Sequence, residues 1–265
     1  MKELVTSGKI SLFTLGCTLL LSTIGTGKAS AVQLDVTAEG ASGTVNGAIF
    51  QQISDDNPAG TGVINSFLRL QSPGNETTEE GYNTDFRPLE FDENNSPQFT
   101  RSLLLSDVPV VNINGTNYRQ FILDINEPNA TNPNPDLPKI TLDMFQIFLG
   151  NAGDLTNYPT FNGDATKIFD LDIGADGDSS VLMQDRNPGS GRYDYLISVA
   201  DSLFQGSNEY VYLYSKFTGA QGGFEEFATG ESENQPPTSV PEPETWVGMG
   251  LVAGAMALLR RRKAS

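Results

Sequence analysis

The side chains with the most evident chemistry are four aspartates close together in the chain: Asp170, Asp172, Asp176 and Asp178. On a β-strand Asp170 and Asp172 share one face, and Asp176-Gly177-Asp178 is typical of the turn that follows. Such oxygen ligands suit Ca²⁺, which takes roughly six to eight of them. An EF-hand is excluded because Met183 stands where its bidentate glutamate belongs. The group therefore predicts either a calcium site of another kind or a solvated strand edge with a tight turn.

A second group consists of three tyrosines, Tyr210, Tyr212 and Tyr214. On a strand they lie on one face, and the intervening Val211 and Leu213 lie on the other. If the aliphatic face is the core, the tyrosines form an exposed ladder that can stack on sugar rings. If the strand is central and buried on both faces, the tyrosines are core residues.

Carboxylate chemistry is the main enzymatic route that the composition leaves open. The sequence contains no histidine, which excludes Ser-His-Asp triads, Cys-His pairs and nearly all zinc sites. Adjacent glutamates occur at Glu79-Glu80 and Glu225-Glu226, and a glycosidase needs two carboxyl groups about 5–10 Å apart. Neighbours on a strand point to opposite faces, which argues against this use. A carboxylate glycosidase is therefore only the third hypothesis, and we expect a protein that is not an enzyme.

The elements that must position these groups read as β-strands. Short runs of alternating apolar and polar residues recur between breaks rich in Gly, Asn, Pro and Asp. We predict strands over Val32–Thr37, Gly43–Gln51, Gly62–Gln71, Gln98–Leu104, Val110–Ile113, Tyr118–Asn126, Lys139–Leu149, Lys167–Ile173, Ser180–Gln184, Arg192–Ala200 and Glu209–Phe217. The chain shows no fixed repeat, as a β-solenoid would require. The pattern predicts an all-β fold with a single β-sandwich domain over 32–228, jelly-roll-like or Greek key.

Three polar stretches are predicted to be loops or linkers. Gln71–Gly81 is acidic, and Asn126–Lys139 is too rich in Asn and Pro to be a central strand. Residues 229–239 form an acidic, Pro-containing linker after the domain.

Residues 1–31 have the pattern of a secretory signal peptide. Lys2 and Lys9 precede an apolar run that predicts a signal helix. Ala29 and Ala31 are the small residues that a signal peptidase accepts, so we place the mature N-terminus near Val32. The alternative, an uncleaved anchor helix, is disfavoured because Thr and Gly interrupt the run.

Residues 240–265 have a complementary pattern. Pro241, Glu242 and Pro243 form a short extended element, the apolar run 246–259 predicts a transmembrane helix, and Arg260, Arg261 and Arg262 follow. A helix of 14 residues is ~21 Å long, and arginine side chains that reach the interface help it to span the bilayer. By the positive-inside rule, the arginines stay in the cytoplasm and the domain lies outside.

This order of Pro-Glu-Pro, apolar helix and terminal arginines resembles the PEP-CTERM sorting signal. The resemblance covers about a tenth of the chain. It implies that a membrane protease of the exosortase type recognises and removes the tail, in a Gram-negative-type envelope with exopolysaccharide. It implies nothing about the activity of the domain.

The charge and the two ends together predict the class of protein. A net charge of −17 repels nucleic acid, so no nucleic-acid partner is expected. We expect an exported protein, held in the membrane by its C-terminal helix before processing. It would then act at the cell surface or in the extracellular matrix as a structural or adhesion protein that contacts exopolysaccharide. The alternative is a calcium-dependent carbohydrate-binding module, in which the aspartates bind the metal and the tyrosines contact sugar.

Overall fold

The computed structural model describes residues 32–53, 64–128, 138–172, 178–186 and 193–230. β-Strands predominate in these residues, and the helical elements among them are three short 3₁₀ turns: η1 (Leu105–Asp107), η2 (Phe161–Gly163) and η3 (Asp201–Leu203). No helix in the described ranges is long and apolar enough to span a membrane. The predicted signal helix in 1–31 and membrane helix at 246–259 lie outside the described residues.

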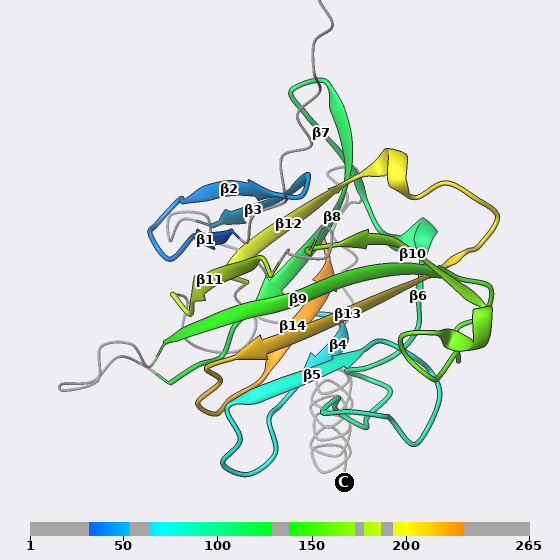
Figure 1. The fold of residues 1–265 in the computed structure, drawn as a ribbon, viewed down its shortest axis with the longest axis horizontal. Coiled ribbons are helices and arrows are strands. Elements are labelled where there is room, and N and C mark those ends of the chain that lie inside the picture. Colours follow the sequence, from blue (N-terminus) through cyan, green and yellow to red (C-terminus); the bar gives the residue numbers. More distant parts are fainter. Residues whose placement is uncertain (1–31, 54–63, 129–137, 173–177, 187–192, 231–265) are drawn as a thin grey trace, which may run out of the picture.

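Seven of the described strands form one sheet, sheet A. They are β1 (Gln33–Asp35), β5 (Thr78–Tyr82), β6 (Leu103–Leu104), β9 (Lys139–Gly150), β10 (Ala165–Asp170), β11 (Ser180–Gln184) and β13 (Tyr210–Thr218). The order is β1-β11-β9-β13-β5, with β10 paired to β9 and β6 paired to β13. All these pairs are antiparallel except β1 with β11. Figure 1 shows β9 and β13 side by side across the middle of the molecule.

Seven further strands form sheet B. They are β2 (Ser42–Val45), β3 (Ala48–Gln52), β4 (Ser66–Leu70), β7 (Val110–Ile113), β8 (Thr116–Asp124), β12 (Tyr195–Ala200) and β14 (Glu225–Thr229). The order is β2-β3-β12-β8-β14-β4, with β7 paired to β8, and every pair is antiparallel. In Figure 1 the strands β8 and β14 cross the direction of β9 and β13.

One buried apolar cluster contains side chains from both sheets. Val211 and Leu213 of β13 belong to it together with Phe121 of β8. The rings of Phe50 on β3 and Phe145 on β9 meet edge to face with centroids 6.2 Å apart. The apolar faces of the two sheets therefore share one core, as the alternating pattern of the sequence requires.

The opposite face of sheet A is covered by a second buried cluster. Its aromatic members are Tyr82, Phe148, Phe161, Tyr212 and Tyr214. The segment that contains η2 supplies Phe161, and it also supplies Tyr158, whose ring stacks on that of Tyr214 with centroids 3.9 Å and planes 11° apart. Strand β13 is consequently buried on both faces.

The prediction of an exposed tyrosine ladder is wrong. Tyr212 and Tyr214 are 1% and 2% exposed, and only Tyr210 is partly exposed. The physical reason is the position of β13 between β9 and β5, under the loop that leads to η2. The alternative interpretation, in which the tyrosines are core residues of a central strand, is confirmed.

The predicted strands agree with the structure in most places, and two of them, Val110–Ile113 and Ser180–Gln184, have the observed bounds of β7 and β11. The predicted strand Gly43–Gln51 is instead the hairpin β2–β3. Its turn is Asn46-Gly47, where both residues have positive φ (49° and 84°), as a type I′ turn requires. The predicted acidic loop Gln71–Gly81 contains most of β5, and β14 was not predicted.

The hydroxyl of Tyr212 gives a test of the second cluster. It donates to the carbonyl of Ala152 (2.6 Å) and accepts from the N–H of Leu155 (2.9 Å). Tyr212→Phe leaves both backbone groups without their partner, so we expect the free energy of unfolding to fall by about 1–3 kcal/mol. Chemical denaturation measures this loss. Tyr210→Phe, on the same strand face but partly exposed, is the matched control and should change stability by less than about 0.5 kcal/mol. Equal losses in both variants would contradict this account.

Candidate functional site

The structure describes three of the four predicted calcium ligands, and Asp176 lies outside the described residues. The Asp170 carboxylate accepts hydrogen bonds from Lys167 Nζ (2.6 Å) and Gln146 Nε2 (3.0 Å). Asp172 Oδ1 accepts the N–H of Ser179 at 2.6 Å, and Asp178 is exposed. Among the described residues, no three acidic side chains are arranged to hold a metal ion. The calcium site, which includes Asp176, stays a prediction.

The negative charges of neighbouring carboxylates nevertheless act on Asp172. Burial raises the pKa of Asp172, and the negative charges of Asp170 and Asp178 raise it further. A cation would relieve this repulsion. Lys167 already does so in part, because it forms an ion pair with Asp170.

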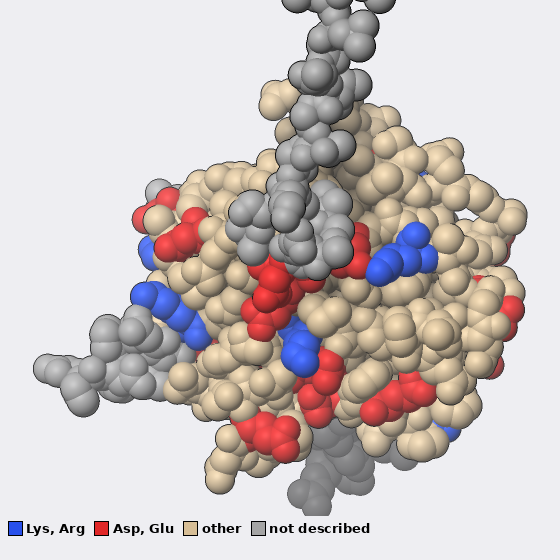
Figure 2. Space-filling view, viewed as in Figure 1, with Lys and Arg blue, Asp and Glu red and all other residues tan. Residues whose placement is uncertain are grey.

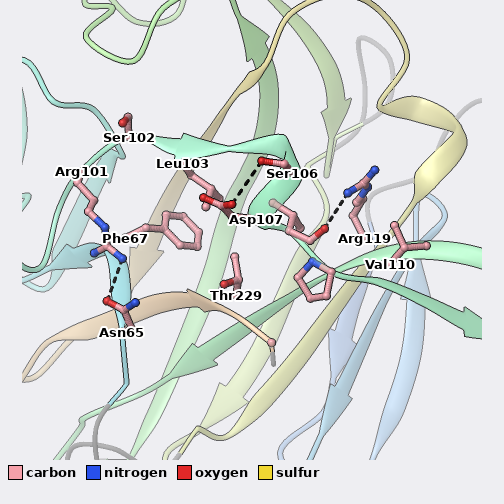
Figure 3. A pocket seen from close by; sticks show the side chains of 13 residues that line it. Asn65, Phe67, Arg101, Ser102, Leu103, Ser106, Asp107, Val110, Arg119 and Thr229 are labelled. Carbon is pink, nitrogen blue, oxygen red and sulfur yellow. Dashed lines mark hydrogen bonds between the residues drawn. The ribbon is translucent and has the colours of Figure 1, made fainter. Parts of the chain in front are cut away.

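A hollow on the described surface lies where sheet B meets β6 and η1. Its volume is about 740 Å³, within the range of ligand pockets. Asn65 and Phe67 come from the start of β4, Ser106 from η1, and Thr229 from the end of β14. The charged side chains of the wall are Arg101, Asp107 and Arg119 (Figure 3).

Arg101 is the one of these cations that lacks an anionic partner among the described residues. Its Nη1 donates to the carbonyls of Ser66 and Gln98, and its Nη2 donates to Asn65 Oδ1 at 2.9 Å. These acceptors are uncharged, and no described carboxylate forms an ion pair with the guanidinium. Burial lowers the pKa of Arg101, an effect opposed by the more distant Asp85 and Asp107. The result is a positioned positive charge at the wall of a pocket.

Arg119 has a structural role in the same wall. Its Nε lies 2.6 Å from Asp201 Oδ1, and its Nη1 donates to the carbonyls of Leu105 (3.0 Å) and Val108 (2.7 Å). These bonds hold η1 between the first hollow and a second one of about 640 Å³, which shares Ser106 and Arg119. The two hollows therefore adjoin at Ser106 and Arg119, and we call them together the groove.

The groove can bind an anion through Arg101 and hydroxyl groups through its polar wall. Ser106 and Thr229 carry hydroxyls at the first hollow, and Val110 adds an apolar edge that is 46% exposed. A guanidinium binds carboxylates well because its planar N–H groups match the two oxygens. Sequence reasoning missed this site, since its residues extend from Asn65 to Gly230 and share no motif.

The predicted processing residues cannot be placed in this arrangement. Ala29, Ala31 and the sorting residues Pro241, Glu242, Pro243, Arg260, Arg261 and Arg262 all lie outside the described residues. Comparison with protein-family models, with curated proteins and with solved structures finds no match to this chain.

A calcium site at the aspartates predicts a higher unfolding midpoint in millimolar CaCl₂ than in EDTA, because a ligand that binds only the folded state stabilises it. Thermal unfolding of the full-length chain in a mild non-ionic detergent measures this difference. Asp172→Ala should abolish the rise, whereas Asp164→Ala, outside the proposed ligands, should keep it. An unchanged wild-type midpoint would reject the calcium hypothesis.

Proposed function

We propose that this chain is an exported protein of the cell surface or extracellular matrix, with a structural or adhesive role, sorted by a PEP-CTERM-like tail. The position of the β domain in the chain supports this proposal. Every described strand lies between Gln33 and Thr229, that is, between the predicted signal peptide at 1–31 and the predicted tail at 240–265. Removal of both ends would leave each of these strands in place.

We further propose that the domain is a β-sandwich of the jelly-roll or Greek-key kind. The shared apolar cluster supports this architecture, because it joins side chains from the inner faces of both sheets. In such a domain the strand edges and end loops are free for contacts with other molecules. A structural protein of the matrix needs that combination of a closed core and several contact surfaces.

The surface chemistry suits a secreted, highly soluble domain. The chain carries 33 acidic and 16 basic residues, and Figure 2 shows acidic side chains in several groups over one face, with fewer basic ones between them. Charge of one sign keeps a protein soluble and disfavours non-specific binding to anionic polymers. Binding to an acidic polymer would therefore need a local positive charge.

The pocket at Arg101 favours a second candidate function, a carbohydrate-binding module for acidic saccharides. Its guanidinium can pair with a sugar carboxylate while hydroxyls and amides of the wall bond to sugar hydroxyls. In this candidate function the pocket residues contact the sugar, because Tyr212 and Tyr214 are buried. A glycosidase has less support, because Glu79 and Glu225 are each 1% exposed and a sugar cannot reach them in this conformation.

Processing of the tail tests the primary proposal. In a bacterium that carries an exosortase-type protease, the wild-type chain should lose its tail and leave the membrane fraction. Replacement of Pro241, Glu242 and Pro243 by alanine should keep the full-length form in the membrane, as immunoblots of fractionated cells would show. The matched control replaces Pro236 and Pro237, which lie in the linker outside the motif. Identical processing of all three forms would refute the sorting role.

Binding to an immobilised uronate-containing polysaccharide tests the second candidate. Arg101→Gln should weaken binding roughly tenfold or more, because a hydrogen bond to a charged group is lost. Arg87→Gln removes the same charge from a guanidinium that bonds to the carbonyls of Thr84 and Thr100 and does not line the pocket, so this variant should bind like the wild type. A neutral polysaccharide provides the second control. Equal binding by the Arg101 and Arg87 variants would remove the pocket from consideration.

A further inference from the structure

Three buried glutamates from different parts of the chain meet where the two sheets approach each other. Glu79 lies on β5 of sheet A and Glu225 begins β14 of sheet B, and each is 1% exposed. Glu127, which follows β8, is 6% exposed. The carboxyl group of Glu225 lies within hydrogen-bonding reach of those of Glu79 and Glu127, and the three groups interact electrostatically. We call these three residues the glutamate trio.

Backbone N–H groups satisfy only some of the hydrogen-bond acceptors of the trio. The N–H of Ser72 donates to Glu79 Oε2 (2.9 Å), and that of Gln221 donates to Glu127 Oε2 (2.8 Å). The N–H of Asn126 donates to Glu225. The Oε1 atoms of Glu79 and Glu225 are buried without any hydrogen-bond donor from the protein. Each of these oxygens is therefore short of one proton donor.

Basic side chains on the surrounding strands interact with other carboxylates. Arg69 of β4 pairs with Glu226 at 2.8 Å, and Lys216 of β13 lies 3.7 Å from Glu80. Arg186 after β11 lies 3.9 Å from Glu39, and the charge of Lys139 at the start of β9 acts on Asp35. The other charged groups that act on the trio are acidic. The charge of Asp92 acts on Glu79, and that of Asp185 acts on Glu127. The Asp185 carboxylate also accepts a hydrogen bond from the Glu127 N–H (3.1 Å).

An ionised carboxylate cannot donate a hydrogen bond, so two ionised carboxylates cannot bond to each other. Burial of three negative charges without a cation is also very costly. One proton on Glu225 solves both problems, because the resulting hydroxyl donates to a neighbouring carboxylate oxygen. We propose that the trio holds at least one proton in the folded protein at neutral pH, and that this proton joins the two sheets at Glu79 and Glu225.

The titration behaviour of the three groups agrees with this geometry. Burial raises the pKa of Glu225 well above its ordinary value, and the charges of Glu79 and Glu127 add to the effect. Burial likewise raises the pKa of Glu79 and raises that of Glu127 to about 8. An acid whose pKa is raised by folding stabilises the fold fully below its unfolded pKa, and this contribution is lost as pH rises through the folded pKa. The trio thus makes the junction of the sheets sensitive to alkaline pH.

The main experiment is thermal unfolding of the full-length chain in mild detergent and EDTA, between about pH 5 and about pH 9. The wild-type midpoint should fall by at least ~3 °C as the pH rises over this range. Glu225→Gln keeps a buried N–H donor without a titrating proton, so its profile should be clearly flatter. Glu226→Gln is the matched control: it breaks the ion pair with Arg69, so its midpoint should be lower at every pH while the wild-type slope remains.

Infrared spectroscopy gives a direct measurement that does not depend on the stability of the variants. The carbonyl stretch of a protonated carboxyl group should be present in the wild type at neutral pH and reduced in Glu225→Gln. A wild-type midpoint that is constant or rises with pH, or the absence of that band, would overturn the proposal. So would a CaCl₂-dependent loss of the band together with a higher midpoint, because the trio would then hold a cation in place of the proton.

Discussion

The pairing of β9 with β13 is the constraint on which the other features of the domain depend. The two strands pair from Gly150 and Tyr210 to Thr141 and Thr218, and both faces are buried over Phe145–Gly150 and Val211–Ser215. One face packs into the core shared with sheet B, and the other lies under the aromatic cluster. Because both faces need apolar bulk, β13 alternates tyrosine with valine and leucine. The loop up to η2 must then supply polar partners such as the Leu155 N–H for the tyrosine hydroxyls.

Strand alternation also decides the environment of the acidic residues. In each adjacent pair, Glu79-Glu80 and Glu225-Glu226, the two side chains point to opposite faces. Glu80 and Glu226 thereby reach Lys216 and Arg69 and form ion pairs with these cations. Glu79 and Glu225 point inward and meet each other. The same two-residue period thus places one carboxyl of each pair in an ion pair and the other in the glutamate trio, where a proton is the proposed counter-charge.

Under the export proposal, this domain must be stable outside the cell without covalent cross-links. Cys17 is the only cysteine of the chain, so no intramolecular disulfide can form. Stability therefore depends on the two apolar clusters and on buried polar contacts such as those of Arg119 with η1. The surface remains for function, and there the positioned guanidinium of Arg101 is unusual because the chain is strongly acidic. A structural or adhesive role is consistent with this division between a closed interior and a polar groove.

The sequence by itself determined the class of fold and the position of most strands. The two-residue period is local information, and it is visible in the runs that became β7, β9 and β11. The sequence also contains Asn46-Gly47, a pair that favours the type I′ turn of the β2–β3 hairpin. The composition excluded histidine chemistry, and the two ends motivated the export hypothesis, which concerns residues outside the described fold.

Only the tertiary structure decided which faces are buried and which distant residues meet. The sequence allows the tyrosines of β13 to be exposed or internal. They are internal because the loop with Tyr158 packs over them. Strands β5 and β14 escaped prediction because their acidic residues suggested solvent, and burial of Glu79 and Glu225 depends on neighbours far along the chain. The pocket at Arg101 likewise combines residues from Asn65 to Gly230. Burial and long-range contact are properties of packing, and a single sequence does not encode them in any local pattern.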